Sequence, residues 1–133
     1  PRAPPLLLRV SDIMHTGDQL PRVREDTTLG AALLEISRKG LGMTTVVSRD
    51  GDLVGIFTDG DLRRSLDKSL DIHNTMIRDV MTRNGKTIEA HHLAAEALNI
   101  MEEMKINALP VTDEQNQLVG AINMHDLLRA GVI

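Results

Sequence analysis

Two stretches of the chain place an aspartate three residues after a hydroxyl or amide side chain, close behind a glycine. The first is Gly55-Ile56-Phe57-Thr58-Asp59-Gly60-Asp61, and the second is Gly120-Ala121-Ile122-Asn123-Met124-His125-Asp126. A hydroxyl at a helix start lies beside unpaired N–H groups that suit a phosphate, and an aspartate one turn later can accept hydrogen bonds from a vicinal diol such as ribose. Thr58 and Asp61 therefore fit the phosphate and the sugar of a nucleotide.

The same spacing also has a purely structural interpretation. Thr58-x-x-Asp61 is a capping-box pattern, and Asn123-x-x-Asp126 is a variant of it. On spacing alone, capping is favoured over ligand binding. The recurrence of the motif does not decide between the two, because both copies of a repeated helix need a cap.

The two junctions belong to an internal repeat. Leu53-Val54-Gly55 recurs 65 residues later as Leu118-Val119-Gly120, and Asp61-Leu62-x-Arg64 recurs at the same offset as Asp126-Leu127-x-Arg129. Further upstream, Asp12-Ile13-Met14 matches Asp79-Val80-Met81 at an offset of 67. Ordered blocks of this kind indicate two copies of one structural unit.

Each copy predicts the element order β-α-β-β-α. In the first copy Leu29, Leu33 and Ile36 share one helical face, with Thr27 or Thr28 as the N-cap and Gly40 as the C-terminal stop. Short extended segments are expected around Val23 and Ile88, after polar loops at 15–22 and 82–86. In the second copy Leu93, Ala97, Ile100 and Met104 recur at the same helical spacing. The remaining predicted elements are strands at 43–48, 53–58, 109–112 and 118–123, and helices at about 60–66 and 125–130.

Composition narrows the function classes. The chain has 133 residues, a formal net charge of −4, no Cys, no Trp, no Tyr and a single Phe. Disulfides and thiolate zinc sites are therefore excluded, and a nucleic-acid surface built on stacked aromatic rings and positive charge is disfavoured. The apolar stretches are too short for a membrane-spanning helix, and we expect a cytoplasmic protein.

The domain layout follows from the repeat. We expect a linker at 1–9 that joins an upstream domain, a first repeat at 10–70 and a second repeat at 71–133. A unit of about 60 residues buries little core by itself. The fold class is therefore predicted to be α/β (α+β), with two pseudo-symmetric β-α-β-β-α repeats packed sheet to sheet and a ligand cleft between them.

The repeat, the Asp-Ile/Val-Met openings and the Gly-x-x-Thr-x-x-Asp junction resemble a tandem pair of CBS domains, known as a Bateman module. Such a pair is typically a regulatory sensor of adenosine nucleotides. The longer strings at 6–15, 55–64 and 124–131 resemble the C-terminal regulatory part of bacterial D-arabinose 5-phosphate isomerases. These enzymes interconvert ribulose 5-phosphate and arabinose 5-phosphate at the start of Kdo synthesis for lipopolysaccharide or capsule.

The resemblance implies a ligand site. Asp61 and Asp126 would bind ribose hydroxyls and Thr58 the phosphate or ribose, while Asn123 stands where threonine is usual. Because the chain is acidic overall, the phosphate charge must be met locally, and the candidates for this are Arg22, Arg63, Arg64, Lys86 and Arg129. The full set of candidate ligand-binding residues is His15, Thr16, Arg22, Val23, Met43, Thr44, Thr58, Asp61, Arg64, Lys86, Ile88, Ala108, Asn123, His125, Asp126 and Arg129.

Two functions remain open from the sequence. The first is a sensor that needs no cofactor, binds an effector such as AMP, ATP or CMP-Kdo, and regulates a catalytic isomerase domain in the same full-length chain. The alternative is a structural dimerisation or tethering module without a ligand. We expect a homo-oligomer, no catalytic residues in this part of the chain, and no metal site, since His91 and His92 are adjacent and would not share a helix face.

Overall fold

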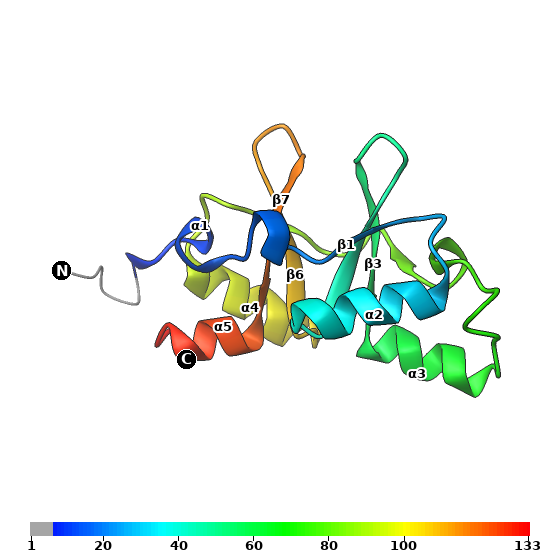
Figure 1. The fold of residues 1–133 in the computed structure, drawn as a ribbon. Helices are drawn as coiled ribbons and strands as arrows, with labels where there is room; N and C mark the ends of the chain where they lie inside the picture. Colours follow the sequence, from blue (N-terminus) through cyan, green and yellow to red (C-terminus); the bar gives the residue numbers. More distant parts are fainter. Residues whose placement is uncertain (1–6) are drawn as a thin grey trace. The chain divides into compact units, whose positions relative to one another are not determined.

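The computed structural model describes residues 7–133. Most of the predicted linker at 1–9 lies outside the described residues. The chain is a mixed α/β protein with a four-stranded and a three-stranded sheet, which confirms the predicted fold class (Figure 1). It divides into two compact units, Leu20–Gly85 and a unit that joins the described part of 1–19 to Lys86–Ile133.

The unit Leu20–Gly85 is built on a sheet with the order β1-β2-β3-β4. Strand β1 is parallel to β2, and the other neighbours are antiparallel. Its strands and helices are β1 (Arg22–Arg24), α2 (Leu29–Lys39), β2 (Met43–Val47), β3 (Leu53–Thr58), α3 (Asp59–Asp67) and β4 (Thr82–Arg83), with a short 3₁₀ helix at Ile77–Asp79. In Figure 1 the β2–β3 hairpin turn and the β3–α3 junction lie at opposite ends of this unit.

The core of this unit explains the helical pattern seen in the sequence. Leu29 and Ala32 of α2 are fully buried against Val46, Phe57 and Ile77. Burial of such side chains removes apolar area from water and is the main stabilising contribution to the unit.

The ends of α2 are as the sequence predicts. Thr28 is the N-cap, and its hydroxyl accepts a hydrogen bond from the backbone N–H of Ala31 at 3.2 Å. Gly40 ends the helix with φ 73°, a left-handed conformation that glycine adopts without strain. Lys105 ends the equivalent helix of the second repeat with φ 56°, so the same stop is made there without glycine.

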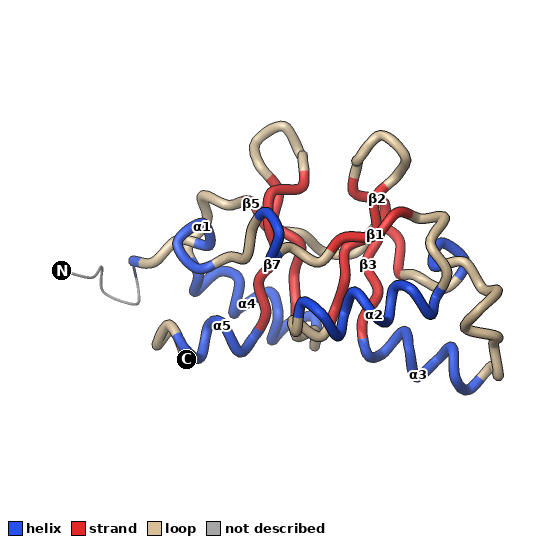
Figure 2. The backbone as a smooth tube through the Cα atoms, viewed as in Figure 1, coloured by secondary structure: helices blue, strands red, loops and turns tan. Residues whose placement is uncertain are grey.

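The second unit has the sheet order β5-β6-β7. Its elements are α1 (Val10–Ile13), a 3₁₀ turn at Gly17–Gln19, β5 (Ile88–Glu89), α4 (Ala94–Met104), β6 (Ala108–Thr112), β7 (Leu118–Asn123) and α5 (Met124–Arg129). The antiparallel β6–β7 hairpin has the longest register in this sheet, and Figure 2 shows the loop that joins its two strands. An isolated antiparallel bridge between His15 and Ala121 takes the place that β4 has in the other unit.

The predicted loops at 15–22 and 82–86 are only partly loops. Thr82–Arg83 forms strand β4 against β3, and His15 pairs with β7. Each of these segments satisfies its backbone groups by pairing with the edge strand of a hairpin that is distant in sequence. Local patterns carry no signal for such long-range pairing, which is why the sequence analysis predicted loops there.

The compact units are also divided differently from the predicted repeats at 10–70 and 71–133. The described residues before Leu20 pack with the second repeat. The segment that follows α3, up to Gly85, packs with the first repeat. The main-chain bonds agree with this exchange: Val10 N–H donates to the His92 carbonyl at 2.8 Å, and Ile77 N–H donates to the Thr27 carbonyl at 2.8 Å. Among the described residues, no helix combines the length and apolar character needed to cross a bilayer.

Candidate ligand-binding site

The first predicted junction is a helix start with both halves of a capping box. Thr58 ends β3 in extended conformation, and its backbone N–H donates to Oδ2 of Asp61 at 3.0 Å. The Thr58 hydroxyl also donates to this oxygen, at 3.3 Å. The capping interpretation of Thr58-x-x-Asp61 is therefore confirmed.

Asp61 does more than cap α3. Its other oxygen, Oδ1, accepts from Arg64 Nη2 at 2.5 Å and from the hydroxyl of Thr82 in β4 at 2.7 Å. The carboxylate is 3% exposed and receives four hydrogen bonds, which matches the acceptor capacity of a carboxylate. A ribose hydroxyl could bind the Asp61 carboxylate only by displacing one of these donors, for example Arg64 or Thr82. The assignment of Asp61 to ribose stays a prediction.

The second junction repeats this arrangement with one substituted partner. The backbone N–H of Asn123 donates to Oδ2 of Asp126 at 2.8 Å, and the Asn123 side-chain oxygen accepts from the Asp126 N–H at 2.9 Å. Oδ1 of Asp126 is 2.8 Å from Arg129 Nη2 and 2.8 Å from His15 Nε2. His15 therefore contacts Asp126 as Thr82 contacts Asp61 in the first junction. The two positions are related by the offset of 67 residues that was found between the opening motifs of the repeats.

The glycine of each junction makes room for the methionine of the other repeat's opening motif. A Cβ on Gly55 would lie 2.7 Å from Met81 Sδ and 2.7 Å from the Thr82 carbonyl oxygen. A Cβ on Gly120 would lie 2.8 Å from Met14 Sδ and 3.0 Å from the His15 carbonyl oxygen. The two sequence motifs that mark the repeat are therefore in contact with each other.

A pocket of about 610 Å³ lies beside the first junction. It is bounded by α3 and by the segment that leads from α3 to β4. Its polar lining consists of Asp61, Arg64, Ser65, Lys68, Asn74, Thr75 and Asp79. All of these residues belong to the unit Leu20–Gly85.

The other candidate residues divide by exposure. Arg22, Lys86, Thr16, His125 and Arg63 have exposed side chains. Those that are buried or half-buried on strands are Val23, Met43, Thr44, Ile88 and Ala108. Of the predicted set, the structure joins Thr58, Asp61 and Arg64 in one hydrogen-bonded group, and His15, Asn123, Asp126 and Arg129 in another.

Of the ten residues that line the pocket, the sequence analysis named only Asp61 and Arg64 as ligand-binding candidates. Ser65 lies one turn beyond Asp61 on α3, and Lys68 is the C-cap residue of this helix, so the helical period was an available signal for both. No local pattern connects Asn74 to α3, because it follows the helix in an irregular segment.

The histidine pair at 91–92 does not lie on a helix. Both residues precede α4, in the turn that follows β5. The argument from helix faces therefore does not apply to them. In the described part of the chain, one ligand atom from each of Glu89, His91 and His92 lies within 4.8 Å of the others.

Comparison with known proteins decides the family. The CBS domain model matches residues 10–68 and 77–133, which together span most of the chain. This chain belongs to the CBS domain family. The CBS pair is a regulatory type of domain and not a catalytic one, as the sequence analysis expected for this part of the protein.

The CBS pair is also similar to curated enzymes. It is 59% identical over 128 residues to arabinose 5-phosphate isomerase KdsD of Pseudomonas aeruginosa, and 50% identical over 128 residues to the KdsD enzyme of Escherichia coli K12. In both cases 96% of this chain is matched, but only 39% of the relative's length.

Solved structures share the fold. A CBS pair protein, CBSX2 in complex with AMP, superposes with a TM-score of 0.77 at 23% identity, covering 94% of this chain and 96% of that one. The CBS domain pair of protein MJ0100, in complex with 5′-methylthioadenosine and S-adenosyl-L-methionine, superposes with a TM-score of 0.80 at 23% identity, covering 91% and 97%.

Proposed function

We propose that this chain is the ligand-sensing regulatory part of a D-arabinose 5-phosphate isomerase, and that it binds a nucleotide or nucleotide-sugar. The observation that carries the proposal is the pocket beside Asp61 and Arg64. Its volume of about 610 Å³ falls in the usual range for small-molecule sites. The predicted cleft between the two repeats stays a prediction, and the proposal concerns the unit Leu20–Gly85 alone.

Two basic side chains of this pocket could bind a phosphate, although the acidic Asp61 and Asp79 also line it. Arg64 lies in the last turn of α3 and Lys68 is the C-cap residue of this helix, and both residues line the pocket. The Arg64 side chain is 65% exposed, and a guanidinium carries five N–H donors, so the bond to Asp61 leaves donors for an incoming phosphate. Ser65 and Asn74 add polar groups that could bind the rest of the ligand.

Two kinds of ligand follow from the comparisons. The fold accommodates adenosine compounds in other proteins, which supports AMP or ATP. The isomerase relatives support a feedback effector from Kdo synthesis, for which CMP-Kdo is the activated end product. In either case the ligand would regulate the isomerase domain of the full-length chain by binding two of its states with different affinity.

Calorimetric titration of the chain with AMP, ATP, CMP and CMP-Kdo tests the proposal. We expect one of these compounds to bind, and Arg64→Gln to weaken its binding at least tenfold because a charged phosphate contact is lost. The matched control is Arg129→Gln, which removes the equivalent bond to Asp126 in the other unit and should leave the affinity unchanged. Absence of binding by all four compounds, or equal affinity in Arg64→Gln, would contradict the proposal.

Asp61 itself is a poor test residue. Asp61→Ala removes a helix cap and leaves Thr82 and Arg64 without their acceptor, at a cost of roughly 2–4 kcal/mol in the free energy of unfolding. Ligand affinity would then fall whether or not the carboxylate touches the ligand. Arg64 avoids this ambiguity because most of its side chain lies in solvent.

The structural alternative has an observation in its favour. Four helices expose a large apolar side chain: Leu34 on α2 at 65%, Leu66 on α3 at 58%, Met104 on α4 at 53% and Leu128 on α5 at 55%. A module that only joins catalytic domains would bury such side chains against a second copy. Light scattering tests the tethering function, because tethering requires a dimer, and a monomeric chain would contradict it. Binding of any of the four nucleotides in the calorimetric titration would contradict a module without a ligand.

A further inference from the structure

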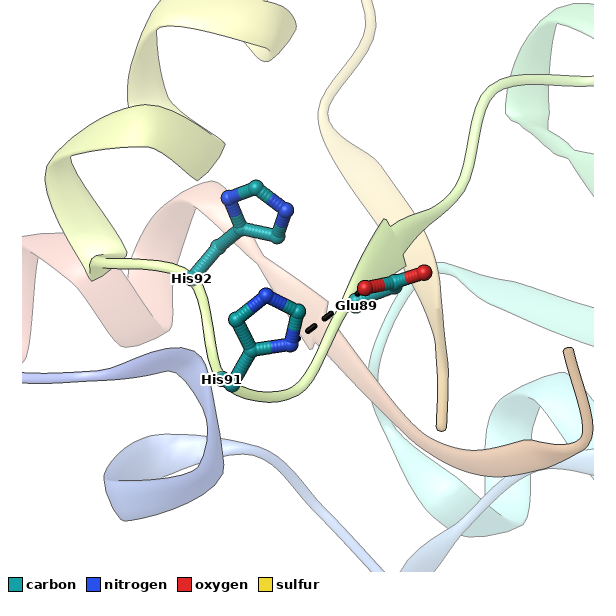
Figure 3. A group of neighbouring side chains, drawn as sticks. All are labelled: Glu89, His91 and His92. Carbon is teal, nitrogen blue, oxygen red and sulfur yellow. Dashed lines mark ion pairs between the residues drawn. The ribbon is translucent and has the colours of Figure 1, made fainter. Parts of the chain in front are cut away.

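A cluster of two histidines and a glutamate stands apart from the nucleotide pocket. Glu89 ends β5, and His91 and His92 follow in the turn before α4 (Figure 3). The two imidazole rings are stacked with their centroids 4.5 Å apart. His91 Nδ1 is 3.3 Å from Glu89 Oε2, the contact drawn as a dashed line in Figure 3.

The distance of 3.3 Å between His91 Nδ1 and Glu89 Oε2 is suited to binding a metal ion. Two ligand atoms at about 2.0–2.1 Å from a tetrahedral Zn²⁺ lie about 3.3 Å from each other. The nitrogen of His91 and the oxygen of Glu89 therefore already have the separation of two zinc ligands. A cation could therefore be bound by both atoms with little change in their separation.

Glu96 orients the second histidine. Its Oε2 is 2.5 Å from His92 Nδ1, and it lies one helical turn further along, on α4. A carboxylate only accepts, so Nδ1 carries the hydrogen and Nε2 of a neutral His92 keeps its lone pair. The hydrogen bond from His92 is the main cause that holds the pKa of Glu96 below its ordinary value. A carboxylate behind a ligating histidine is the usual second partner in zinc sites.

The turn that carries the cluster is held in place by the backbone. His92 N–H donates to the Glu89 carbonyl at 3.1 Å, and the His92 carbonyl accepts from Val10 N–H at 2.8 Å. The guanidinium of Arg9 donates to the His91 carbonyl at 2.5 Å. A rigid turn loses little conformational entropy when its side chains bind an ion.

We propose that Glu89, His91 and His92 form a binding site for a divalent transition-metal ion of the Zn²⁺ type, with Glu96 as the positioning residue of His92. Two imidazoles and one carboxylate make a donor set typical of zinc with a fourth position open. The side chains of Glu89, His91 and His92 are 43%, 55% and 39% exposed, so an ion reaches them directly from solvent and water can fill the fourth position. The bound ion would join the end of β5 to the start of α4.

The untagged chain, titrated with Co²⁺ and followed by its visible absorption, tests the site. We expect the d–d bands of four-coordinate cobalt, displaced by Zn²⁺, and their loss in the double variant His91→Ala/His92→Ala. Calorimetry with Zn²⁺ should show affinity lowered about 10–100-fold in Glu96→Gln, the effect of removing a group behind a ligand.

The other exposed histidines supply matched controls. His73→Ala and His125→Ala each remove one exposed imidazole outside the cluster and should leave the Zn²⁺ affinity unchanged. Circular dichroism checks that each variant is folded. Equal Zn²⁺ binding by the wild-type chain and the double variant would show adventitious binding only and overturn the proposal, as would equal loss of affinity in His125→Ala.

Discussion

Asp61 and Asp126 each connect a helix start to a segment that is distant in sequence. Asp61 accepts from its own cap residue and from Thr82, 21 residues away, and Asp126 lies 2.8 Å from His15, 111 residues away. A buried carboxylate is costly unless it is fully hydrogen-bonded, and these contacts supply that compensation. The two aspartates therefore stabilise the fold, and a ligand would meet carboxylates that already accept hydrogen bonds from the chain itself.

The junction glycines are predicted to tolerate no side chain. Gly55→Ala places a methyl group 2.7 Å from the Thr82 carbonyl oxygen, a backbone atom that cannot move aside as a flexible side chain can. We expect the free energy of unfolding to fall by about 1–3 kcal/mol, measured by urea denaturation followed by circular dichroism. Gly120→Ala should cost less, since its closest backbone atom is 3.0 Å away.

Gly85→Ala is the control for this experiment. Its Cβ would meet Ile56 at 3.6 Å, which is ordinary contact, and its φ is not positive. We expect a change within about 0.5 kcal/mol. A loss in Gly85→Ala as large as in Gly55→Ala would show that close approach is not the reason for the glycine.

The segment between α3 and β4 is ordered by its own polar contacts. Asp71 accepts from the Asn74 side chain at 2.6 Å and from the backbone N–H of His73 at 2.9 Å. Further along, Leu29 N–H donates to the Thr75 carbonyl at 2.7 Å, which ties the segment to the start of α2. The connector thus has a defined path and forms one wall of the pocket.

Asp71 makes this element sensitive to acid. The hydrogen bond from the Asn74 side chain, followed by that from the His73 backbone, holds the pKa of Asp71 below its ordinary value of 3.8. Because the folded-state pKa is the lower one, the contribution of Asp71 to stability is complete above the unfolded-state pKa and is lost as the pH falls through the folded-state pKa.

Carboxyl-carbon NMR titration checks this prediction. Asn74→Ala should raise the pKa of Asp71 toward 3.8, and the stabilities of variant and wild type should converge at the acid end of the titration. Asn99→Ala, an exposed asparagine on α4, is the control and should leave the pKa of Asp71 unchanged. An unchanged pKa in Asn74→Ala would contradict the assignment.

The opening segment of each sequence repeat packs in the compact unit that is formed mainly by the other repeat. Val10 belongs to the first sequence repeat but is fully buried in the core of the second unit, beside Ile88, Ala94 and Leu109. Its counterpart at the offset of 67 is Ile77, which is fully buried in the core of the unit Leu20–Gly85. Each compact unit is therefore assembled from both sequence repeats.

Amide hydrogen exchange can test in which compact unit each opening segment packs. Val10→Ala should cost about 1–3 kcal/mol and increase amide exchange first in β6 and β7, whereas Ile77→Ala should cost about 2–5 kcal/mol and increase it first in β2 and β3. The two variants serve as controls for each other. Faster exchange of β2 and β3 in Val10→Ala would contradict the assignment of Val10 to the second unit.

Much of the local structure was predictable because it depends on neighbours in sequence. The hairpin strands Leu53–Thr58 and Leu118–Asn123 have the predicted bounds, and Thr28 and Gly40 cap α2 as expected. The contact between Asp61 and Arg64 also follows from helical spacing. Turn chemistry, capping and side-chain period are all encoded within a few residues.

The contacts that complete the junctions were decided only by the tertiary structure. Nothing near His15 indicates Asp126, and nothing near Thr82 indicates that it pairs as a strand with β3. Backbone pairing and burial depend on which distant segment reaches an edge strand, and that depends on packing over the whole chain. The sequence by itself thus determined the repeat, most of its helices and strands, and the resemblance to its family. The folded chain determined which repeat each opening segment completes, and that each aspartate is bonded to donors of the chain itself.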